Sequence, residues 1–364
     1  MDEFHLILYK TNNFNEMKIN YVFTIAILLV ICLSCTDEPV QTVFPDITTD
    51  KGVLIACEGN FMYGNGSLSF YDYNNKAVVR DFFYGRNNAP LGDLVQSLGI
   101  YGDKVFVVVN NSGKVYIADS KTIEFRGVIP GLTSPRYIHI ISKNKAYISD
   151  IISNQITIID PESGRITGSI DLETYTSEKM VQTADKVFVT SWSYGKHLLV
   201  IDPVTDELLT AIEVPLQPKD IVVDKNQKLW VLSDGGYEGS PAGHENPALS
   251  RIDPVSFRIE EIFRFNDNAM PSVLEINNAG DTLYFVDGDF FKMAVNSNDL
   301  PESPFIESGN RMFYSVGIDP VSGEIYLADV IDWSQNGEVL RFSKSADLID
   351  SFKVGVNPTD FLFR

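Results

Sequence analysis

A short apolar strand pattern recurs seven times along the chain after residue 51. Each copy joins a polar or small first residue to an apolar core that is aromatic in most copies. The copies begin at Gly52, Lys104, Lys145, Lys186, Lys228, Thr282 and Glu324. Successive starts are 52, 41, 41, 42, 54 and 42 residues apart. Repeats near 40 to 45 residues, each made of several short strands, are typical of β-propellers.

Each repeat carries further strand patterns besides the recurring one. The strand that follows it ends near an aspartate, at Asp72, Asp119, Asp160, Asp202 and Asp253. Turns such as residues 160–164 and 202–206 then begin Asp-Pro, which suits a type I turn, and a third strand follows. The fourth strand follows a proline, as it does at Pro135, Pro218 and Pro271.

The C-terminal segment predicts how the ring closes. Residues 358–364, PTDFLFR, match the post-proline strand, and the first repeat lacks that strand. We therefore predict an all-β fold over residues 51–364, a seven-bladed β-propeller closed by pairing of the C-terminal strand with the first blade. Such pairing covers strand edges that would otherwise be exposed. A ring of six or eight blades is the competing count.

Residues 1–35 have the features of a leader and lipoprotein signal. Residues 21–34 form a continuous apolar stretch that is short for a membrane span. The stretch ends in Leu33-Ser34-Cys35, which resembles the lipobox of bacterial lipoproteins. The alternative is an ordinary secretory signal with a chance cysteine.

The lipobox resemblance implies that Cys35 is lipidated and anchors the protein in the outer membrane, facing the cell exterior. The acidic stretch at residues 36–38 resembles the surface-export signal of Bacteroidetes lipoproteins. Residues 36–50 are polar and contain two prolines, which predicts a flexible tether. Because Cys32 belongs to the leader and Cys35 carries lipid, Cys57 is left alone and no intramolecular disulfide is expected.

The charge of the chain argues against nucleic acid as a partner. There are 49 Asp and Glu against 29 Lys and Arg, which gives a formal net charge of −20. Such a surface repels a phosphate backbone. The acidic residues are scattered rather than massed in a tail, so a solvated, soluble surface is the simplest meaning of the charge.

Two sets of loops share one face of the predicted ring: those that enter the post-proline strand and those that follow the recurring strand. These loops carry aromatic, Asn and Arg side chains, which can cover a ligand or hydrogen-bond to it, and residues 234–248 form the longest. We predict a ligand-binding site that contains Asn60, Phe61, Tyr63, Arg86, Asn88, Arg136, Trp192, Tyr194, Tyr237, Arg311 and Trp333. The alternative is that the aromatic residues pack against neighbouring loops and cap the ring.

The repeat resembles that of YncE-like propellers over residues 51–364. Residues 56–61, followed by 66–72, look like the first blade of Bacteroidetes surface propeller lipoproteins, a group that includes the BtuG-type cobalamin-binding proteins. The resemblance implies a cell-surface protein that captures a small nutrient, a corrinoid (vitamin B12), for a TonB-dependent outer-membrane transporter. A corrinoid is broad and rimmed with amides, which would suit an aromatic and Asn-rich face.

Signals for catalysis are weak. The sequence has no Gly-x-Ser-x-Gly elbow and no phosphate-binding glycine loop between a strand and a helix. His139, His197 and His244 fall in different blades without metal-ligand spacing, and residues 287–289 read as a turn. We therefore predict a binding protein rather than an enzyme, with neither a cofactor nor a metal.

Two other functions stay open from the sequence. A metal-dependent propeller hydrolase or lactonase could draw its ligands from separate blades, for which Glu58, Asn60, Asp150 and Asp234 are candidates. A protein-interaction scaffold on a transporter would instead bind a barrel without small-molecule affinity of its own.

Overall fold

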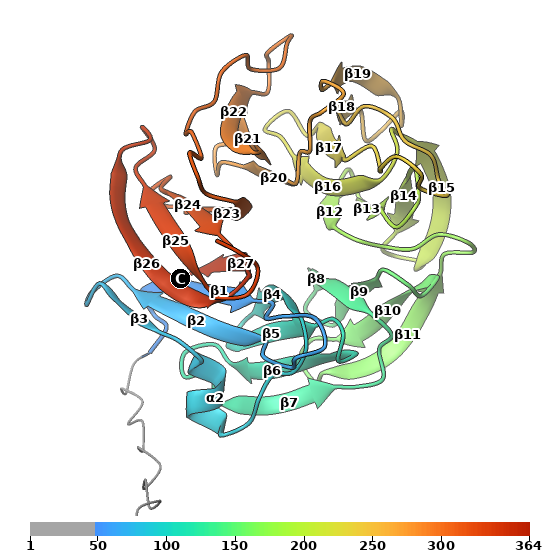
Figure 1. Ribbon diagram of the computed structural model, residues 1–364. Helices are drawn as coiled ribbons and strands as arrows, with labels where there is room; N and C mark the ends of the chain where they lie inside the picture. The colour runs from blue at the N-terminus through green and yellow to red at the C-terminus, as the bar shows by residue number, and fades with distance from the viewer. Residues whose placement is uncertain (1–47) are drawn as a thin grey trace, which may run out of the picture. The chain divides into compact units, whose positions relative to one another are not determined.

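Seven small antiparallel sheets make up the described part of the chain. The computed structural model describes residues 48–364, and these sheets form a ring (Figure 1). The predicted seven-bladed, all-β propeller is thereby confirmed. The predicted leader, the lipidation residue Cys35 and the tether up to residue 47 lie outside the described residues. Within residues 48–364, no helix is long and apolar enough to cross a membrane.

Each blade begins with a strand at the centre of the ring. From blade 1 to blade 7, these innermost strands are β27 (Pro358–Phe363), β4 (Val95–Tyr101), β8 (Pro135–Ser142), β12 (Met180–Thr183), β16 (Pro218–Val223), β20 (Val273–Ile276) and β23 (Phe313–Ile318). The recurring strands of the sequence lie second, as β1 (Gly52–Cys57), β5 (Lys104–Val109), β9 (Lys145–Asp150), β13 (Lys186–Ser191), β17 (Leu229–Ser233), β21 (Thr282–Asp287) and β24 (Ile325–Asp329). They are apolar because neighbouring blades cover both of their faces, and β1 is buried along its whole length.

The outer strands complete the blades. The third strands are β2 (Ser67–Asp72), β6 (Lys114–Asp119), β10 (Gln155–Asp160), β14 (His197–Asp202), β18 (Ala248–Ile252), β22 (Asp289–Ala294) and β25 (Asn336–Phe342). The fourth strands are β3 (Ala77–Val79), β7 (Phe125–Ile129), β11 (Arg165–Asp171), β15 (Glu207–Glu213), β19 (Ile259–Arg264) and β26 (Leu348–Val356).

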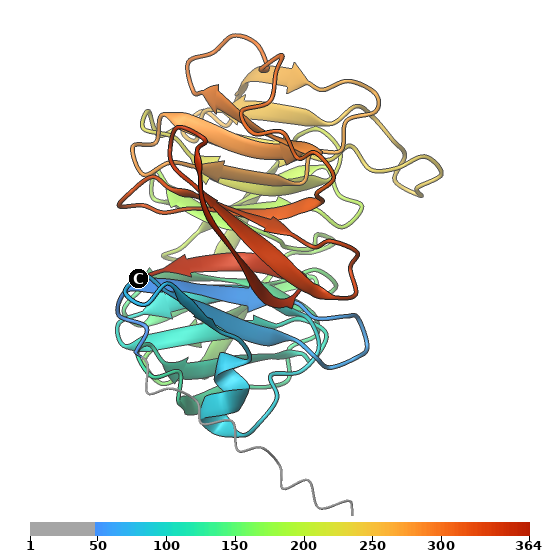
Figure 2. The same ribbon diagram turned by 60° about the vertical axis from the view of Figure 1, so that its left-hand side comes forward.

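The C-terminal strand closes the ring as predicted. β27 pairs antiparallel with β1, with Leu362 opposite Leu54. The backbone N–H of Arg364 also donates to the carbonyl of Gly52 at 2.9 Å. In Figures 1 and 2 the red C-terminal strand lies beside the blue first strand.

Blade 6 differs from the predicted four strands, because it has only β20, β21 and β22. The segment after β22 forms one isolated bridge, between Phe290 and Ile306, where an outer strand would pair. Pro301 and Pro304 precede that bridge, and a proline has no N–H to donate to a strand ladder. The expectation of seven four-stranded blades was therefore wrong for this blade.

The hydrophobic core is divided among the interfaces between blades. In the cluster between blades 5 and 6, Trp230 of β17 packs with Phe285 of β21, and both side chains are buried. The indole N–H of Trp230 donates to Asp224 Oδ2 at 3.0 Å, which satisfies its polar atom inside the core. Similar clusters lie between blades 2 and 3, 3 and 4, 4 and 5, 6 and 7, and 7 and 1, so large side chains hold these blades together.

The strand order assigns every loop to one of two faces. We call the face formed by the loops after the second strands and the loops before the innermost strands the mouth face; it includes residues 58–66, 192–196, 234–247 and 330–335. The Asp-Pro turns at residues 202–206 and 253–257 connect third and fourth strands, so they lie on the opposite face. The residues predicted as ligand-binding come from connections of the mouth-face set, except Arg136, which lies at the start of β8.

Candidate functional site

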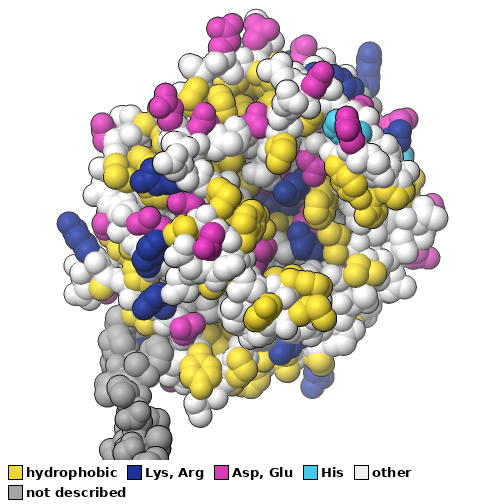
Figure 3. Space-filling view, in the orientation of Figure 1, with side chains coloured by type: hydrophobic (Ala, Val, Ile, Leu, Met, Phe, Trp, Pro, Cys, Tyr) yellow, Lys and Arg dark blue, Asp and Glu magenta, His cyan; other side chains and the backbone are white. Residues whose placement is uncertain are grey.

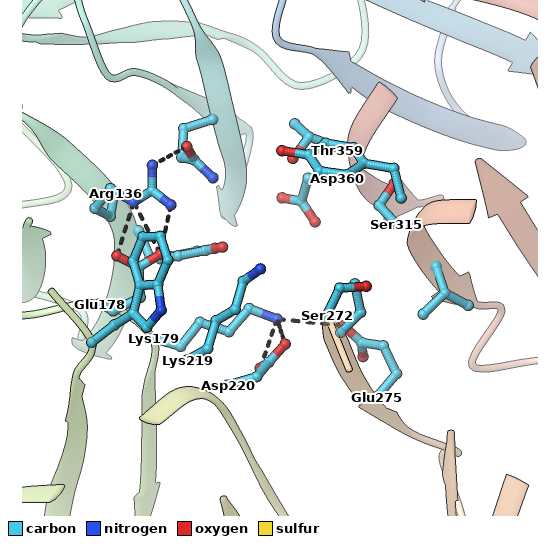
Figure 4. A pocket seen from close by; sticks show the side chains of 16 residues that line it. Arg136, Glu178, Lys179, Lys219, Asp220, Ser272, Glu275, Ser315, Thr359 and Asp360 are labelled. Atoms are coloured by element: carbon cyan, nitrogen blue, oxygen red, sulfur yellow. Dashed lines mark hydrogen bonds and ion pairs between the residues drawn. The ribbon is translucent and has the colours of Figure 1, made fainter. Parts of the chain in front are cut away.

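A polar cavity opens at the centre of the ring. It has a volume of about 130 Å³, and strands β4, β8, β16, β20, β23 and β27 all contribute side chains to its wall (Figure 4). In Figure 3 the centre of the molecule is hollowed, with Lys and Arg side chains inside and hydrophobic side chains around it. We call this cavity the channel mouth.

Arg136 and Glu178 form a paired charge in the wall of the channel mouth. The Arg136 Nε donates to both carboxylate oxygens of Glu178 at 2.9 Å, and a terminal nitrogen donates to Oε1 at 2.7 Å. A further Arg136 nitrogen donates to Gln96 Oε1. Burial disfavours the guanidinium, but the adjacent Glu178 raises the pKa of Arg136 above its ordinary value. This arginine is therefore fixed in place by its own protein partners.

A second charged cluster surrounds Lys179. Its ammonium lies 2.9 Å from Asp220 Oδ1 and 3.6 Å from Glu275 Oε1. Burial raises the pKa of Glu275 to about 7, against the opposing effect of Lys179. Burial also raises the pKa of Asp360 to about 6, although the backbone N–H of Leu98 donates to it at 2.7 Å.

Below the channel mouth, a cavity of about 250 Å³ continues through the ring. Its wall combines apolar and charged side chains, and it shares Lys179, Glu275 and Asp360 with the channel mouth. His139 also lines it, in the inner-strand position that the sequence predicted. Burial lowers the pKa of His139, and its Nε2 has no hydrogen-bond partner within residues 48–364.

Loops of blades 7 and 1 meet beside the channel mouth. The Tyr314 hydroxyl donates to Glu58 at 3.0 and 3.1 Å from the two carboxylate oxygens, and burial raises the pKa of Glu58. The ring of Tyr314 packs edge-on against Trp333 at 5.0 Å. Asn60 Nδ2 donates to the carbonyl of Trp333 at 2.6 Å, so the predicted residues Asn60 and Trp333 are brought together.

Trp192 forms part of the opposite wall. Its indole N–H donates to Asp234 Oδ2 at 2.7 Å, which fixes the ring. The Arg136 guanidinium lies 5.9 Å from the ring centroid and the Lys219 ammonium 5.5 Å from it, both within reach of cation–π attraction.

Large apolar side chains are exposed on the loops of the mouth face. The exposed fractions are 61% for Phe61, 80% for Tyr63, 55% for Tyr194, 54% for Tyr237 and 47% for Trp333. The Tyr194 hydroxyl raises the pKa of Tyr237 through a hydrogen bond, so these two loops also meet. These five residues, which we call the aromatic rim, were all predicted from the sequence.

Three predicted residues lie away from the channel mouth. Arg86 belongs to the short helix α2 (Phe82–Asn87), which packs outside blades 1 and 2, and Asn88 ends that helix (Figure 1). Buried Phe82 and Phe83 hold the helix there. Arg311 is exposed in the connection between blades 6 and 7. None of the three lines the channel mouth.

The four candidate metal ligands have other partners. Glu58 accepts the Tyr314 hydroxyl, and Asn60 donates to the carbonyl of Trp333. Asp150 accepts the backbone N–H of Ser134 at 2.7 Å, and Asp234 accepts the indole N–H of Trp192. Within residues 48–364, no three His, Cys, Asp or Glu side chains are grouped so as to hold a metal ion.

Sequence reasoning missed most of the charges inside the channel mouth. Glu178, Lys179, Asp220, Glu275 and Asp360 were not singled out, although all of them line it. The sequence did contain a pattern that could have found some of these residues. The residues that directly follow the prolines of the innermost strands line the channel mouth. They are Arg136, Lys219, Asp220, Thr359 and Asp360.

The fold and the site define a closed seven-bladed propeller with a charged channel mouth and an aromatic rim. Residues 51–355 match the family model described as Domain of unknown function (DUF5074), and the chain belongs to that family. No curated protein matches the chain.

Solved structures of several proteins share the fold. A quinoprotein alcohol dehydrogenase-like protein of Bacteroides thetaiotaomicron is 16% identical with a TM-score of 0.68, covering 87% of this chain and 79% of its own. The periplasmic gluconolactonase of Pseudomonas aeruginosa is 11% identical with a TM-score of 0.63, covering 86% and 98%. A putative 6-phosphogluconolactonase of Bacteroides uniformis is 16% identical with a TM-score of 0.61, covering 88% and 100%. At these identities the likeness concerns the fold.

Proposed function

We propose that the protein is a cell-surface lipoprotein, anchored through Cys35, that captures a corrinoid on its mouth face for a TonB-dependent outer-membrane transporter. In this proposal the protein binds its ligand and does not transform it. The aromatic rim, exposed on the same face as the channel mouth, is the observation that carries the proposal.

The aromatic rim is costly to leave in water. Its five side chains are about half exposed or more, and all lie on one face. Exposed apolar groups that gather around a polar depression are typical of binding surfaces. Each aromatic ring can bury roughly 150–250 Å² and keeps few rotatable bonds, so it contributes contact area at low entropic cost.

The size of the channel mouth bears on how a ligand would bind. Its volume is about 130 Å³, whereas pockets that enclose drug-sized ligands measure roughly 300–1,000 Å³. A broad ligand would therefore lie across the rim and place only a substituent in the cavity. A corrinoid has that shape, and the resemblance of residues 56–72 to surface propeller lipoproteins supports the same choice.

The first prediction tests capture directly. Purified protein is expected to bind cyanocobalamin at micromolar concentration or below, as measured by isothermal titration calorimetry. Replacing Phe61 and Trp333 together by Ala should weaken binding by roughly tenfold or more, because both rings lose their contact area. Phe125→Ala removes a half-exposed ring from the outer strand β7 and should leave the affinity unchanged.

The outcome separates this proposal from the other two functions. Absence of cyanocobalamin binding at micromolar concentration contradicts corrinoid capture. A stoichiometric divalent ion in the purified protein would instead favour a metal-dependent hydrolase or lactonase. Co-purification with an outer-membrane barrel without any ligand affinity would favour a scaffold.

A further inference from the structure

Three cations line the channel mouth, and Lys219 is the one that forms no ion pair within residues 48–364. Arg136 is paired with Glu178, and Lys179 with Asp220. The Lys219 ammonium, in contrast, has no carboxylate oxygen within ion-pair distance among residues 48–364, and its contact is the Trp192 ring. Figure 4 shows Lys219 extending into the open part of the cavity with no interaction drawn to it.

Asp360 is a carboxylate in the same cavity whose described partners are backbone N–H groups. One oxygen accepts the N–H of Leu98 at 2.7 Å and the other the N–H of Phe361 at 2.9 Å. No cation among residues 48–364 forms an ion pair with it. A carboxylate can accept about four hydrogen bonds, so Asp360 keeps acceptor capacity toward the cavity.

The two groups face the same small space from different blades. Lys219 lies on β16 of blade 5 and Asp360 on β27 of blade 1, and both line the channel mouth (Figure 4). A ligand group that fits between them must accept a hydrogen bond on one side and donate one on the other. A carboxylate would be repelled by Asp360, and an ammonium by Lys219 and Lys179.

We propose that the channel mouth binds one primary carboxamide group of its ligand. The amide oxygen accepts a hydrogen bond from the Lys219 ammonium, and the amide NH₂ donates to the Asp360 carboxylate. A carboxamide carries both functions in one planar group, and a cavity of about 130 Å³ has room for it and its short stem. The inference rests on the proposed function where it assigns that amide to a side chain of a corrinoid.

Three small probes test the head group independently of any corrinoid. Saturation-transfer NMR is used to compare propionamide, propionate and propylammonium on the purified protein. Propionamide is expected to bind most tightly. Lys219→Met should weaken propionamide roughly tenfold or more, because the hydrogen bond to a charged donor is lost. The matched control is Lys225→Met, which changes a lysine in the turn on the opposite face and should have no effect.

A second variant tests the orientation of the group. Asp360→Asn replaces one of the two acceptor oxygens by an NH₂ donor and removes the charge that repels a carboxylate, so the preference should shift from propionamide toward propionate. Equal binding of propionamide and propionate to the unchanged protein, or full affinity in Lys219→Met, would overturn the proposal. Asp360 also links two blades through its hydrogen bond with Leu98, so a melting curve checks that Asp360→Asn is folded. If this variant does not fold, the result for Lys219→Met alone tests the proposal.

A second experiment tests whether the amide belongs to a corrinoid. It compares the binding of cyanocobalamin with that of the derivative in which one propionamide is hydrolysed to the acid. Weaker binding of the acid by the unchanged protein, with the difference reduced in Lys219→Met, supports the assignment. Propionamide selectivity without cyanocobalamin binding would contradict the corrinoid and leave the amide site standing. Cyanocobalamin binding that is indifferent to Lys219 would contradict the amide site and leave capture standing.

Discussion

Individual acids in the channel differ because each has a different set of partners. Asp220 lies 2.9 Å from the Lys179 ammonium, while Glu275 is 3.6 Å from it, and burial raises the pKa of Glu275 to about 7. A carboxyl that is buried with incomplete compensation prefers its neutral form. The charge of the channel should therefore change near neutral pH.

The sign of the pH effect on stability follows from the raised pKa of Glu275. The folded protein binds this proton more tightly than the unfolded chain, whose glutamates titrate near 4.5. The free energy of unfolding should thus fall as pH rises from about 4.5 to about 7. Urea unfolding across this window should show a smaller fall for Glu275→Gln. Equal pH dependence of variant and parent would contradict the assignment.

Among the elements, the innermost strands show how far the sequence predicts a site. The post-proline pattern predicted four of them, β8, β16, β20 and β27, and Arg136 follows such a proline and lines the channel mouth. Lys179 and Glu178 were missed because the strand they precede, β12, follows no proline. Arg86 looked like a mouth residue because its connection leads to an inner strand, but helix α2 takes it outward.

β27 is the element on which the ring depends most. Removing residues 358–364 would expose the edge of β1 and leave its buried side chains without cover. We expect this truncation to unfold or aggregate, as seen by circular dichroism and size-exclusion chromatography. Removing Arg364 alone is the control and should leave a folded ring that elutes like the parent. A longer truncation that melts like the parent would contradict closure through β27.

Blade 6 should be the least protected blade. It lacks a fourth strand, and β22 receives only a single bridge on its outer side. Amide groups without a stable ladder partner exchange faster with solvent. Hydrogen exchange is expected to be faster in β22 than in β25, the third strand of blade 7. Equal protection would show that residues 295–312 cover this edge as well as a strand does.

For the whole molecule, the repeat was sufficient to predict the architecture. The seven recurring strands and the post-proline pattern of the C-terminal segment predict the seven blades and the closing strand that the structure has. Ligand chemistry is less accessible to the same reasoning, because it arises where different blades converge. Lys219 and Asp360 are 141 residues apart in sequence and face one cavity only after the ring has closed.

The pairing of β27 with β1 also sets an order of events in time. Among the described strands, β27 is synthesised last, yet it supplies the innermost strand of the first blade. Until it arrives, the channel has a gap in its wall and Asp360 is missing from the site. Contacts between such distant segments form slowly. Binding competence should consequently appear late, in the same step that joins the two ends of the propeller.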